Sequence, residues 1–190
     1  HIPVLKKEIL KYLDPKPNEN FIDCTINGGG HAVAILEKTS PKGKILGIEL
    51  DKEIYEKLKL KMADRLILIN DSYASLKEIV KKNNFEPING ILFDLGMSSW
   101  HLEESGRGFT FLKDEPLDMR YDTSQELTAE KILNNYSQED IEKILREYGE
   151  ERYSRKIAKR ILENRPIKTT LELVKIIKGS RVYSFSRIFQ

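Results

Sequence analysis

The sequence has very few of the residues that build disulfide frameworks and metal centres. Its 190 residues include one cysteine, Cys24, and three histidines that lie far apart along the chain. A single cysteine excludes an internal disulfide framework and any multi-cysteine metal site, and this usage is typical of a reducing compartment. We therefore expect no metal site and a cytoplasmic location.

Long apolar runs are absent too. No stretch approaches the roughly 18 apolar residues that a membrane-spanning helix needs, and no signal-peptide pattern opens the sequence. Hydrophobic residues make up 39% and charged residues 33% of the chain, which allows a buried core beneath a charged surface. These features predict one ordinary domain, or a domain with an insertion, and no membrane partner.

Positive charge is concentrated near the end of the sequence. Residues 152–190 contain eleven Lys and Arg against two acids, Glu163 and Glu172, which is a net charge of +9. The whole chain carries +2, so residues 1–151 carry −7. This asymmetry favours a surface that faces a polyanion, and a solvated basic helix face is an equally supported alternative.

The first hundred residues alternate short apolar runs with helical patterns. The runs are typical of strands covered on both faces and lie at 21–25, 45–48, 66–69 and 91–93. Helical patterns separate them at about 31–39, 51–61 and 73–83. This order predicts an α/β domain with a doubly wound parallel sheet.

The pattern changes after residue 103, where an irregular stretch leads into helices. Ser137 and Asp140 resemble a capping box before a helix whose apolar stripe includes Tyr148. The next helix, 152–164, has a stripe that includes Tyr153, and a last one ends near residue 179. Opposite the second stripe lies a basic face formed by Arg152, Arg155, Lys156, Lys159 and Arg160. We expect three parts: an α/β domain at 1–103, a helical unit at 104–180 and a return segment at 181–190.

A glycine-rich junction, Asp23–His31, follows the first predicted strand. Its three consecutive glycines let the backbone approach a ligand, and the next helix offers its N-terminal amides. The spacing is not G-x-G-x-x-G, so the dinucleotide fingerprint is not met. Glu49 ends the second strand about 20 residues further on, where an acid accepts both hydroxyls of a ribose. Together they predict a nucleoside-containing cofactor; the alternative is a tight turn with a solvated glutamate.

Two further candidates follow later strands. Asp94 comes after the fourth strand, where open α/β sheets bind ligands; the alternative is a carboxylate that caps amides of its own loop. Tyr73 follows the third strand and is expected on the adenine side of the same cleft, or in plain packing.

Several segments together closely resemble the bacterial small-subunit ribosomal RNA cytosine-N4 methyltransferases of the MraW family. They occur in the family's order as His1–Val4, Asp23–Thr25 with Gly29–His31, Gly90–Gly96, Arg107–Phe109, Pro116–Arg120 and Glu147–Glu151. The resemblance implies S-adenosylmethionine as cofactor and a class I methyltransferase fold, which is a Rossmann-like parallel sheet with a helical insertion. Ser186–Gln190 resembles the point where the family's chain returns to its core. We therefore expect the C-terminal part of the sheet to be missing from this sequence.

Carried over residue by residue, the resemblance implies cofactor contacts from Gly29, Gly30, His31, Glu49, Tyr73, Asp94 and His101. The amide of His31, more than its ring, is expected to touch the ligand. Three positions depart from the family's pattern. Glu49 stands where Asp is usual, Asn27 where Gly is common, and His101 where Gln is usual.

The resemblance also implies methylation of the N4 amine of a cytidine in small-subunit ribosomal RNA, either naked or in the assembled small subunit. Asp94 would accept the amine's proton, and Ser98 or Ser99 would orient the base. The basic face would bind phosphates. A group of aromatic side chains would stack on the unstacked cytosine, or simply pack: Trp100, Phe109 and Phe111.

Two other functions stay open. One is a non-catalytic fragment that binds S-adenosylmethionine and RNA, and the other is a nicotinamide-dependent oxidoreductase on a similar sheet. A homodimer is also allowed.

Overall fold

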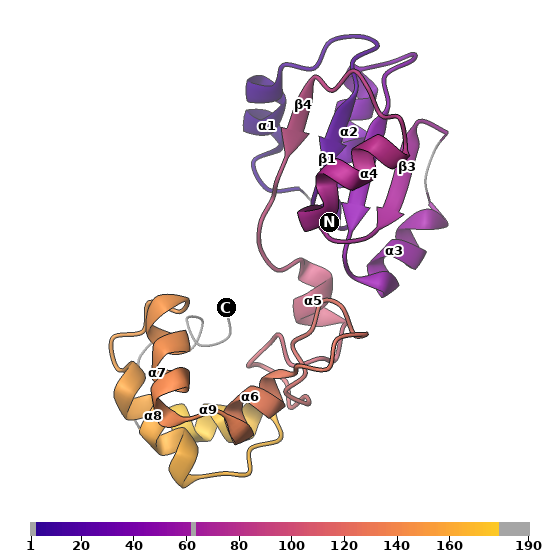
Figure 1. Ribbon diagram of the computed structural model, residues 1–190. Helices are drawn as coiled ribbons and strands as arrows, with labels where there is room; N and C mark the ends of the chain where they lie inside the picture. The colour runs from indigo at the N-terminus through magenta and orange to yellow at the C-terminus, as the bar shows by residue number, and fades with distance from the viewer. Residues whose placement is uncertain (1–2, 62–63, 179–190) are drawn as a thin grey trace. The chain divides into compact units, whose positions relative to one another are not determined.

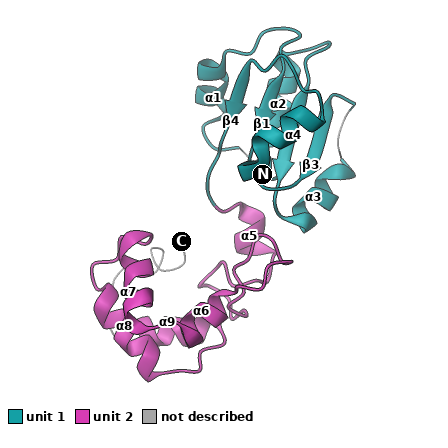
Figure 2. Cartoon of the chain, viewed as in Figure 1, with its two compact units in different colours: residues 1–96 teal, residues 97–190 magenta. Residues whose placement is uncertain are grey.

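The computed structural model describes residues 3–61 and 64–178, and the chain divides into two compact units, residues 1–96 and 97–190 (Figure 2). The division lies earlier than the predicted boundary after residue 103. Helix α5 (Ser99–Glu103) belongs to the second unit, because the ring of His101 packs against those of Phe109 and Tyr121. The predicted return segment 181–190 lies outside the described residues.

The first unit is built on a four-stranded parallel sheet with the order β3-β2-β1-β4 (Figure 1). The strands are β1 (Phe21–Asp23), β2 (Ile45–Glu49), β3 (Leu66–Asn70) and β4 (Gly90–Leu92), and each pair of neighbours is parallel. The predicted α/β class is confirmed. The winding reverses between β1 and β4, so the switch point of the sheet lies where the loops after these two strands begin.

Helices cover both faces of this sheet. The helical segments of the first unit are α1 (Lys6–Leu13), α2 (Gly30–Lys38), α3 (Lys52–Lys59), the 3-10 turn η1 (Tyr73–Ser75) and α4 (Leu76–Lys82). Successive strand residues point to opposite faces. Phe21 and Ile45 therefore pack with α1, α2 and α3, whereas Ile22 and Leu46 pack with α4, which lies in front of the sheet in Figure 1. Burial on both faces explains the continuous apolar runs of the sequence.

The second unit is helical and has its own core. After α5 come α6 (Ala129–Asn135), α7 (Gln138–Glu147), α8 (Ser154–Glu163) and α9 (Thr170–Lys178). Ser137 Oγ accepts a hydrogen bond from the Asp140 amide at 3.1 Å, which confirms the predicted helix start. The core consists of apolar side chains from α7, α8, α9 and the loops before them, chiefly Leu117, Ile141, Leu145, Ile157, Ile161, Ile167 and Ile177.

Two tyrosines that we assigned to helix stripes lie outside this core. Tyr148 is 79% exposed and Tyr153 is 53% exposed. Both lie at helix ends, Tyr148 as the C-cap of α7 and Tyr153 as the N-cap of α8. Tyr148 keeps helical backbone and Tyr153 does not, so what the two share is a place at a helix end, beyond the buried part of each apolar stripe.

The irregular segment before α6 is held by buried polar contacts. The Gly108 amide donates to Glu115 Oε2 at 2.9 Å, and Arg107 Nη1 donates to the Arg120 carbonyl at 2.7 Å. The backbone of Glu115 is itself held in place, because its amide donates to Thr170 Oγ1 at 3.0 Å. No helix in the described part of the chain is long and apolar enough to span a membrane.

We expect Gly108→Ala to destabilise the second unit more than Gly106→Ala. Both glycines have left-handed backbone, with φ of +79° and +64°, which costs a residue with a Cβ roughly 1–2 kcal/mol. At Gly108 the Cβ would also lie 2.3 Å from the Pro116 carbonyl oxygen, whereas at Gly106 it would meet nothing within 4 Å. Urea denaturation measures both losses. Equal losses would contradict the close approach at Gly108.

Candidate functional site

The loop between β1 and α2 makes a tight turn that needs its glycines. Gly29, the N-cap of α2, has a φ of 76°, and its amide donates to the Ile26 carbonyl at 2.8 Å. A Cβ on Gly30 would lie 2.4 Å from Pro3 Cγ. A Cβ on Gly28 would meet nothing within 4 Å, so this residue marks the open side of the loop. Asn27 is also left-handed, with a φ of 45°, which Asn tolerates well.

The side chain of Glu49 connects the loop after β1 to the loop after β2 by hydrogen bonds. Its side chain is buried at the end of β2, where Oε2 accepts the Asn27 amide at 3.0 Å and Oε1 accepts the Asp51 amide at 2.8 Å. Asp51 in turn caps α3. Each carboxylate oxygen can still accept a second hydrogen bond, so the predicted ribose contact stays a prediction.

Asp94 joins the loop after β4 to the loop after β1. Its amide donates to Thr25 Oγ1 at 2.7 Å, and its half-exposed carboxylate places Oδ2 3.5 Å from His31 Nε2. His31 is buried, and neither ring nitrogen has a hydrogen-bond partner among the described residues. A buried ring with unused nitrogens marks a place for a polar group of a ligand. The ring of His31 thus lies beside Asp94, whereas we expected the amide of His31, more than its ring, to touch the ligand.

Asp23 is an acid of this site that the sequence analysis did not single out. It ends β1, is 2% exposed, and its Oδ1 accepts the Thr25 amide at 3.2 Å. The pKa of Asp23 is raised to about 7, chiefly by burial; the Thr25 amide lowers it in part, and the nearby charges of Asp94 and Glu49 contribute to the rise. Burial likewise raises the pKa of Glu49 to about 7. The sequence signal for Asp23 was an acid that ends an apolar strand at the start of the glycine-rich junction.

An aromatic pair borders the same end of the sheet. The rings of Tyr73 and Phe93 meet edge to face with centroids 5.6 Å apart, and both side chains are about half exposed. Tyr73 was predicted on the adenine side of the cleft, and Phe93 was not singled out, because in the sequence it reads as the end of a strand. The pair offers open ring surface for a flat heterocycle.

Ser98 and His101 contact each other in the second unit. Ser98 Oγ caps α5 by accepting the His101 amide at 3.4 Å and lies 2.8 Å from His101 Nδ1. His101 is 1% exposed, with its ring against those of Phe109 and Tyr121. These contacts give both residues a capping and packing role, and their predicted catalytic and cofactor contacts stay predictions. Phe109 is 3% exposed, which leaves no ring face for a base.

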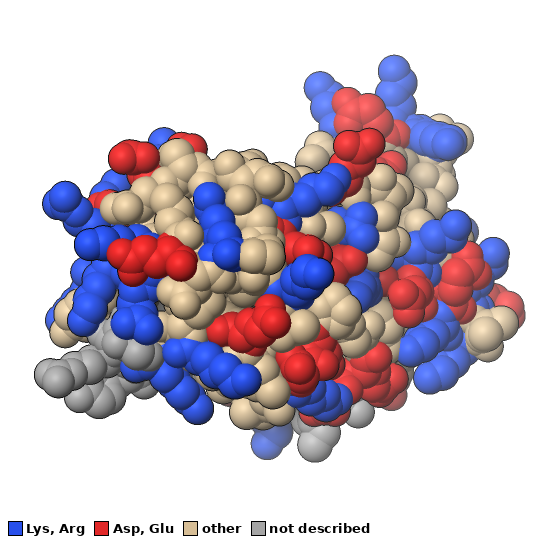
Figure 3. All heavy atoms as spheres, turned by 90° about the horizontal axis from the view of Figure 1, so that it is seen from below, with Lys and Arg blue, Asp and Glu red and all other residues tan. Residues whose placement is uncertain are grey.

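The predicted basic face is largely exposed. Figure 3 shows Lys and Arg side chains gathered over the end of the second unit that α7 and α8 form. Arg160 differs from the prediction, because it is partly buried and its Nε donates to the Ile176 carbonyl at 3.0 Å, which ties α8 to α9. The other four members of the face are exposed: Arg152, Arg155, Lys156 and Lys159.

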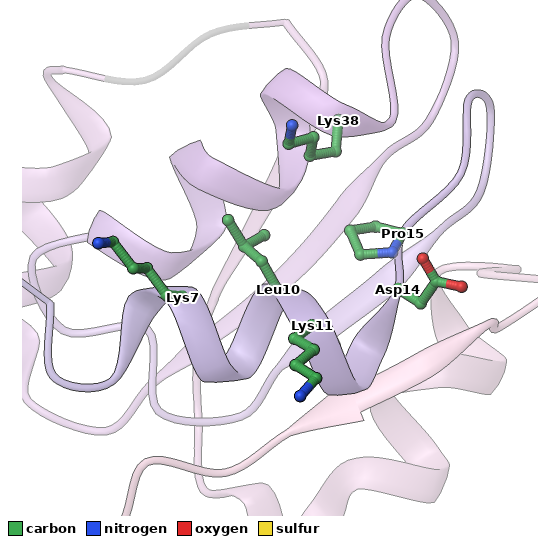
Figure 4. Close-up of a pocket in the computed structure, with 6 residues that line it drawn as sticks. All are labelled: Lys7, Leu10, Lys11, Asp14, Pro15 and Lys38. Atoms are coloured by element: carbon green, nitrogen blue, oxygen red, sulfur yellow. The ribbon is translucent and has the colours of Figure 1, made fainter.

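A separate cavity of about 450 Å³ lies between α1 and α2. Figure 4 shows Leu10 among Lys7, Lys11 and Lys38, whose amino groups point in different directions. Polar groups do not converge on this cavity as they do at the carboxyl ends of the strands. Over residues 3–61 and 64–178, no group of three or more His, Cys, Asp or Glu is arranged to hold a metal ion.

The buried Asp23 predicts a pH-dependent stability. Its pKa of about 7 in the folded chain exceeds the ordinary 3.8, so its ionisation opposes folding and stability falls as pH rises from about 4 to 7. We expect Asp23→Asn to raise the free energy of unfolding at pH 8 by up to about 4 kcal/mol and to change it little at pH 4. Urea denaturation at both pH values measures this. An equal effect at the two values would contradict the buried charge.

Comparison with known proteins places the chain in a family. The model of the MraW methylase family matches residues 1–188. The chain is 46% identical to the ribosomal RNA small subunit methyltransferase H of Thermotoga neapolitana, over 93% of this chain and 60% of that protein. It is 42% identical to the protein of that name from Clostridium botulinum, over 98% of this chain and 62% of that one. The chain thus spans about 60% of the length of the curated relatives it matches.

Among solved structures, the chain is similar to a protein-L-isoaspartate O-methyltransferase, with a TM-score of 0.42 and 17% identity over 50% of this chain and 29% of that one. This likeness is too limited to bear on function. The family match extends over nearly the whole sequence, including the glycine-rich loop and the residues after β4. The chain therefore belongs to the MraW methylase family.

Proposed function

We propose that this chain carries the S-adenosylmethionine site and an RNA-binding surface of a methyltransferase that acts on the N4 amine of a cytidine in small-subunit ribosomal RNA. The observation that carries the proposal is the meeting of the glycine-rich loop, Glu49 and Asp94 at the switch point of a parallel sheet. The names of the relatives, small subunit methyltransferases, support the substrate class. Such a substrate, whether naked RNA or assembled subunit, fits a cytoplasmic location.

The residues of the site fit S-adenosylmethionine. Its ammonium and sulfonium groups are cations, and at this edge of the sheet the charges of Glu49 and Asp94 lie close enough to Asp23 to raise its pKa. The first amides of α2, at Gly30 and His31, are placed for its carboxylate. When bound, this cofactor supplies an electrophilic methyl group.

Asp94 is the residue we assign to proton transfer. Its carboxylate is half exposed, so an incoming amine can reach it, while the bond from its amide to Thr25 Oγ1 fixes the backbone. As the exocyclic nitrogen loses its lone pair to a new bond, its N–H becomes acidic, and an adjacent carboxylate holds and then accepts that proton. His31, 3.5 Å from Asp94 Oδ2, restricts where the carboxylate can turn.

We expect calorimetric titration to detect saturable binding of S-adenosylmethionine to this chain. Asp94→Ala and Glu49→Ala should each weaken it by about tenfold or more, because each removes a charged acceptor. Glu56→Ala, which removes an exposed acid from α3, is the matched control and should leave it unchanged. Binding that survives both site substitutions would contradict the proposed site.

A parallel titration separates the other two functions. Saturable binding of NAD without S-adenosylmethionine would favour an oxidoreductase. Binding of S-adenosylmethionine and RNA without methyl transfer would favour a non-catalytic fragment, and a longer chain that includes the rest of the relatives' length would then decide whether further residues are needed.

We expect the charge reversal Lys156→Glu/Lys159→Glu to weaken RNA binding and to leave cofactor affinity unchanged. Phosphate contacts make binding steeply salt-dependent, so the variant should also show a shallower dependence of affinity on salt. Lys52→Glu/Lys59→Glu on α3 makes the same change in charge and is the control. Fluorescence anisotropy of a labelled ribosomal RNA fragment measures the affinity. A joint loss of RNA and cofactor binding would show that the face is structural.

A further inference from the structure

The turn between α7 and α8 presents two tyrosines to solvent. Tyr148 is 79% exposed and Tyr153 is 53% exposed, although each stands beside a helix whose apolar side chains are buried. Two large aromatic side chains are thus exposed on one short turn, and their rings are open to a ligand. This turn contains the Glu147–Glu151 string that the cofactor site does not use.

The turn is fixed by its own hydrogen bonds. Glu151 is 5% exposed, its Oε1 accepts the Tyr153 amide at 2.8 Å, and its amide donates to the Leu145 carbonyl at 3.0 Å. The Tyr148 amide donates to the Ile144 carbonyl at 3.0 Å. The backbone of both tyrosines is therefore held in place, and little backbone entropy is lost when a ligand contacts their rings.

Charges of both signs lie beside the tyrosines in the sequence, and the cations include two exposed arginines. Arg152 and Arg155 are exposed and have no ion-pair partner among the described residues. The acids Glu142 and Glu147 lie 3.3 and 3.7 Å from the guanidinium of Arg146, which offsets one of their two negative charges. The surface thus combines aromatic rings with free cations.

This combination is the one that binds unpaired nucleic acid. Bases stack on aromatic rings while arginines contact the backbone phosphates, and stacking is available only where bases are not paired. We propose that Tyr148 and Tyr153, together with Arg152 and Arg155, form a stacking surface for unpaired bases of the RNA substrate. This inference rests on the proposed function, because it specifies how the RNA of that function is held.

The test compares single-stranded and duplex RNA on the 190-residue chain. A single-stranded oligoribonucleotide carrying 2-aminopurine reports stacking through quenching, and anisotropy gives its affinity and that of its duplex. Tyr148→Ala/Tyr153→Ala should lower single-stranded affinity at least about fivefold, abolish the quenching and leave the salt slope unchanged. Tyr148→Phe/Tyr153→Phe should keep both, because the rings remain. Tyr12→Ala is the matched control, since Tyr12 is 83% exposed on α1.

The outcomes separate this inference from the proposed function. If Arg152→Gln/Arg155→Gln weakens binding and lowers the salt slope while the alanine pair binds like the parent chain, RNA binding stands and the stacking surface is refuted. If Tyr148→Phe/Tyr153→Phe loses as much RNA affinity as Tyr148→Ala/Tyr153→Ala, the stacking surface is also refuted. The hydroxyl groups, and not the rings, would then account for the binding. If the parent chain binds S-adenosylmethionine but neither RNA, both the RNA surface of the proposed function and this inference are wrong.

Discussion

The buried carboxylate of Glu49 is the contact on which the candidate site depends. By accepting the amides of Asn27 and Asp51, it joins the loop after β1 to the loop after β2. The bond from the Asp94 amide to Thr25 Oγ1 adds the loop after β4. Three loops from three strands are therefore connected by the chain's own groups. A site assembled in this way loses little entropy when a ligand arrives, which is the physical basis of preorganisation.

This arrangement has a cost in stability. Asp23 and Glu49 are buried beside each other's charge, and burial raises the pKa of each to about 7. Above neutral pH the folded chain therefore carries ionised carboxylates that water would solvate better than the protein does. The free energy of this desolvation lowers the free energy of unfolding. A bound cation would offset it, because its attraction to the carboxylates is largest where they are least solvated. Binding sites commonly lower stability in this way, because they contain buried ionisable groups that an apolar core would exclude.

The sequence predicted the parts of the fold that bury apolar residues on a fixed period. The four strands were found because Phe21 and Ile22 face opposite covered sides of the sheet, as do Ile45 and Leu46. Helix α1 was not predicted, because it begins after Leu5 without a side-chain cap and contains no buried residue. The short helices α5 and α6 are too brief for a periodic pattern to show.

From the sequence, the residues of the candidate site could be placed after the strands, but the contacts that each side chain makes with its neighbours could not. The glycines of the loop and the acids Glu49 and Asp94 could be found from their positions after strands. The role of His31 depends on which groups its ring faces, and that of His101 depends on the aromatic rings of Trp100, Phe109 and Tyr121 that pack around it. Tyr148 and Tyr153 were assigned to a core because a helical period was extended past the ends of α7 and α8.

Local groups of opposite charge lie in the two units, where the proposed function expects ligands of opposite charge. Each has its own core, and the clusters of buried apolar residues found over residues 3–61 and 64–178 each stay within one unit. The carboxyl groups of the candidate cofactor site lie in the first unit, whereas the exposed arginines and lysines of α8 and its start lie in the second. A cationic cofactor and a polyanionic RNA need potentials of opposite sign, and charges of both signs on one small surface would cancel.

The two units do not differ in net charge, because residues 1–96 hold 15 Lys and Arg against 14 acids and residues 97–190 hold 17 against 16. The sequence asymmetry lies inside the second unit, where residues 97–151 carry −8 and residues 152–190 carry +9. A basic potential can therefore develop only locally, at the start and along the exposed face of α8.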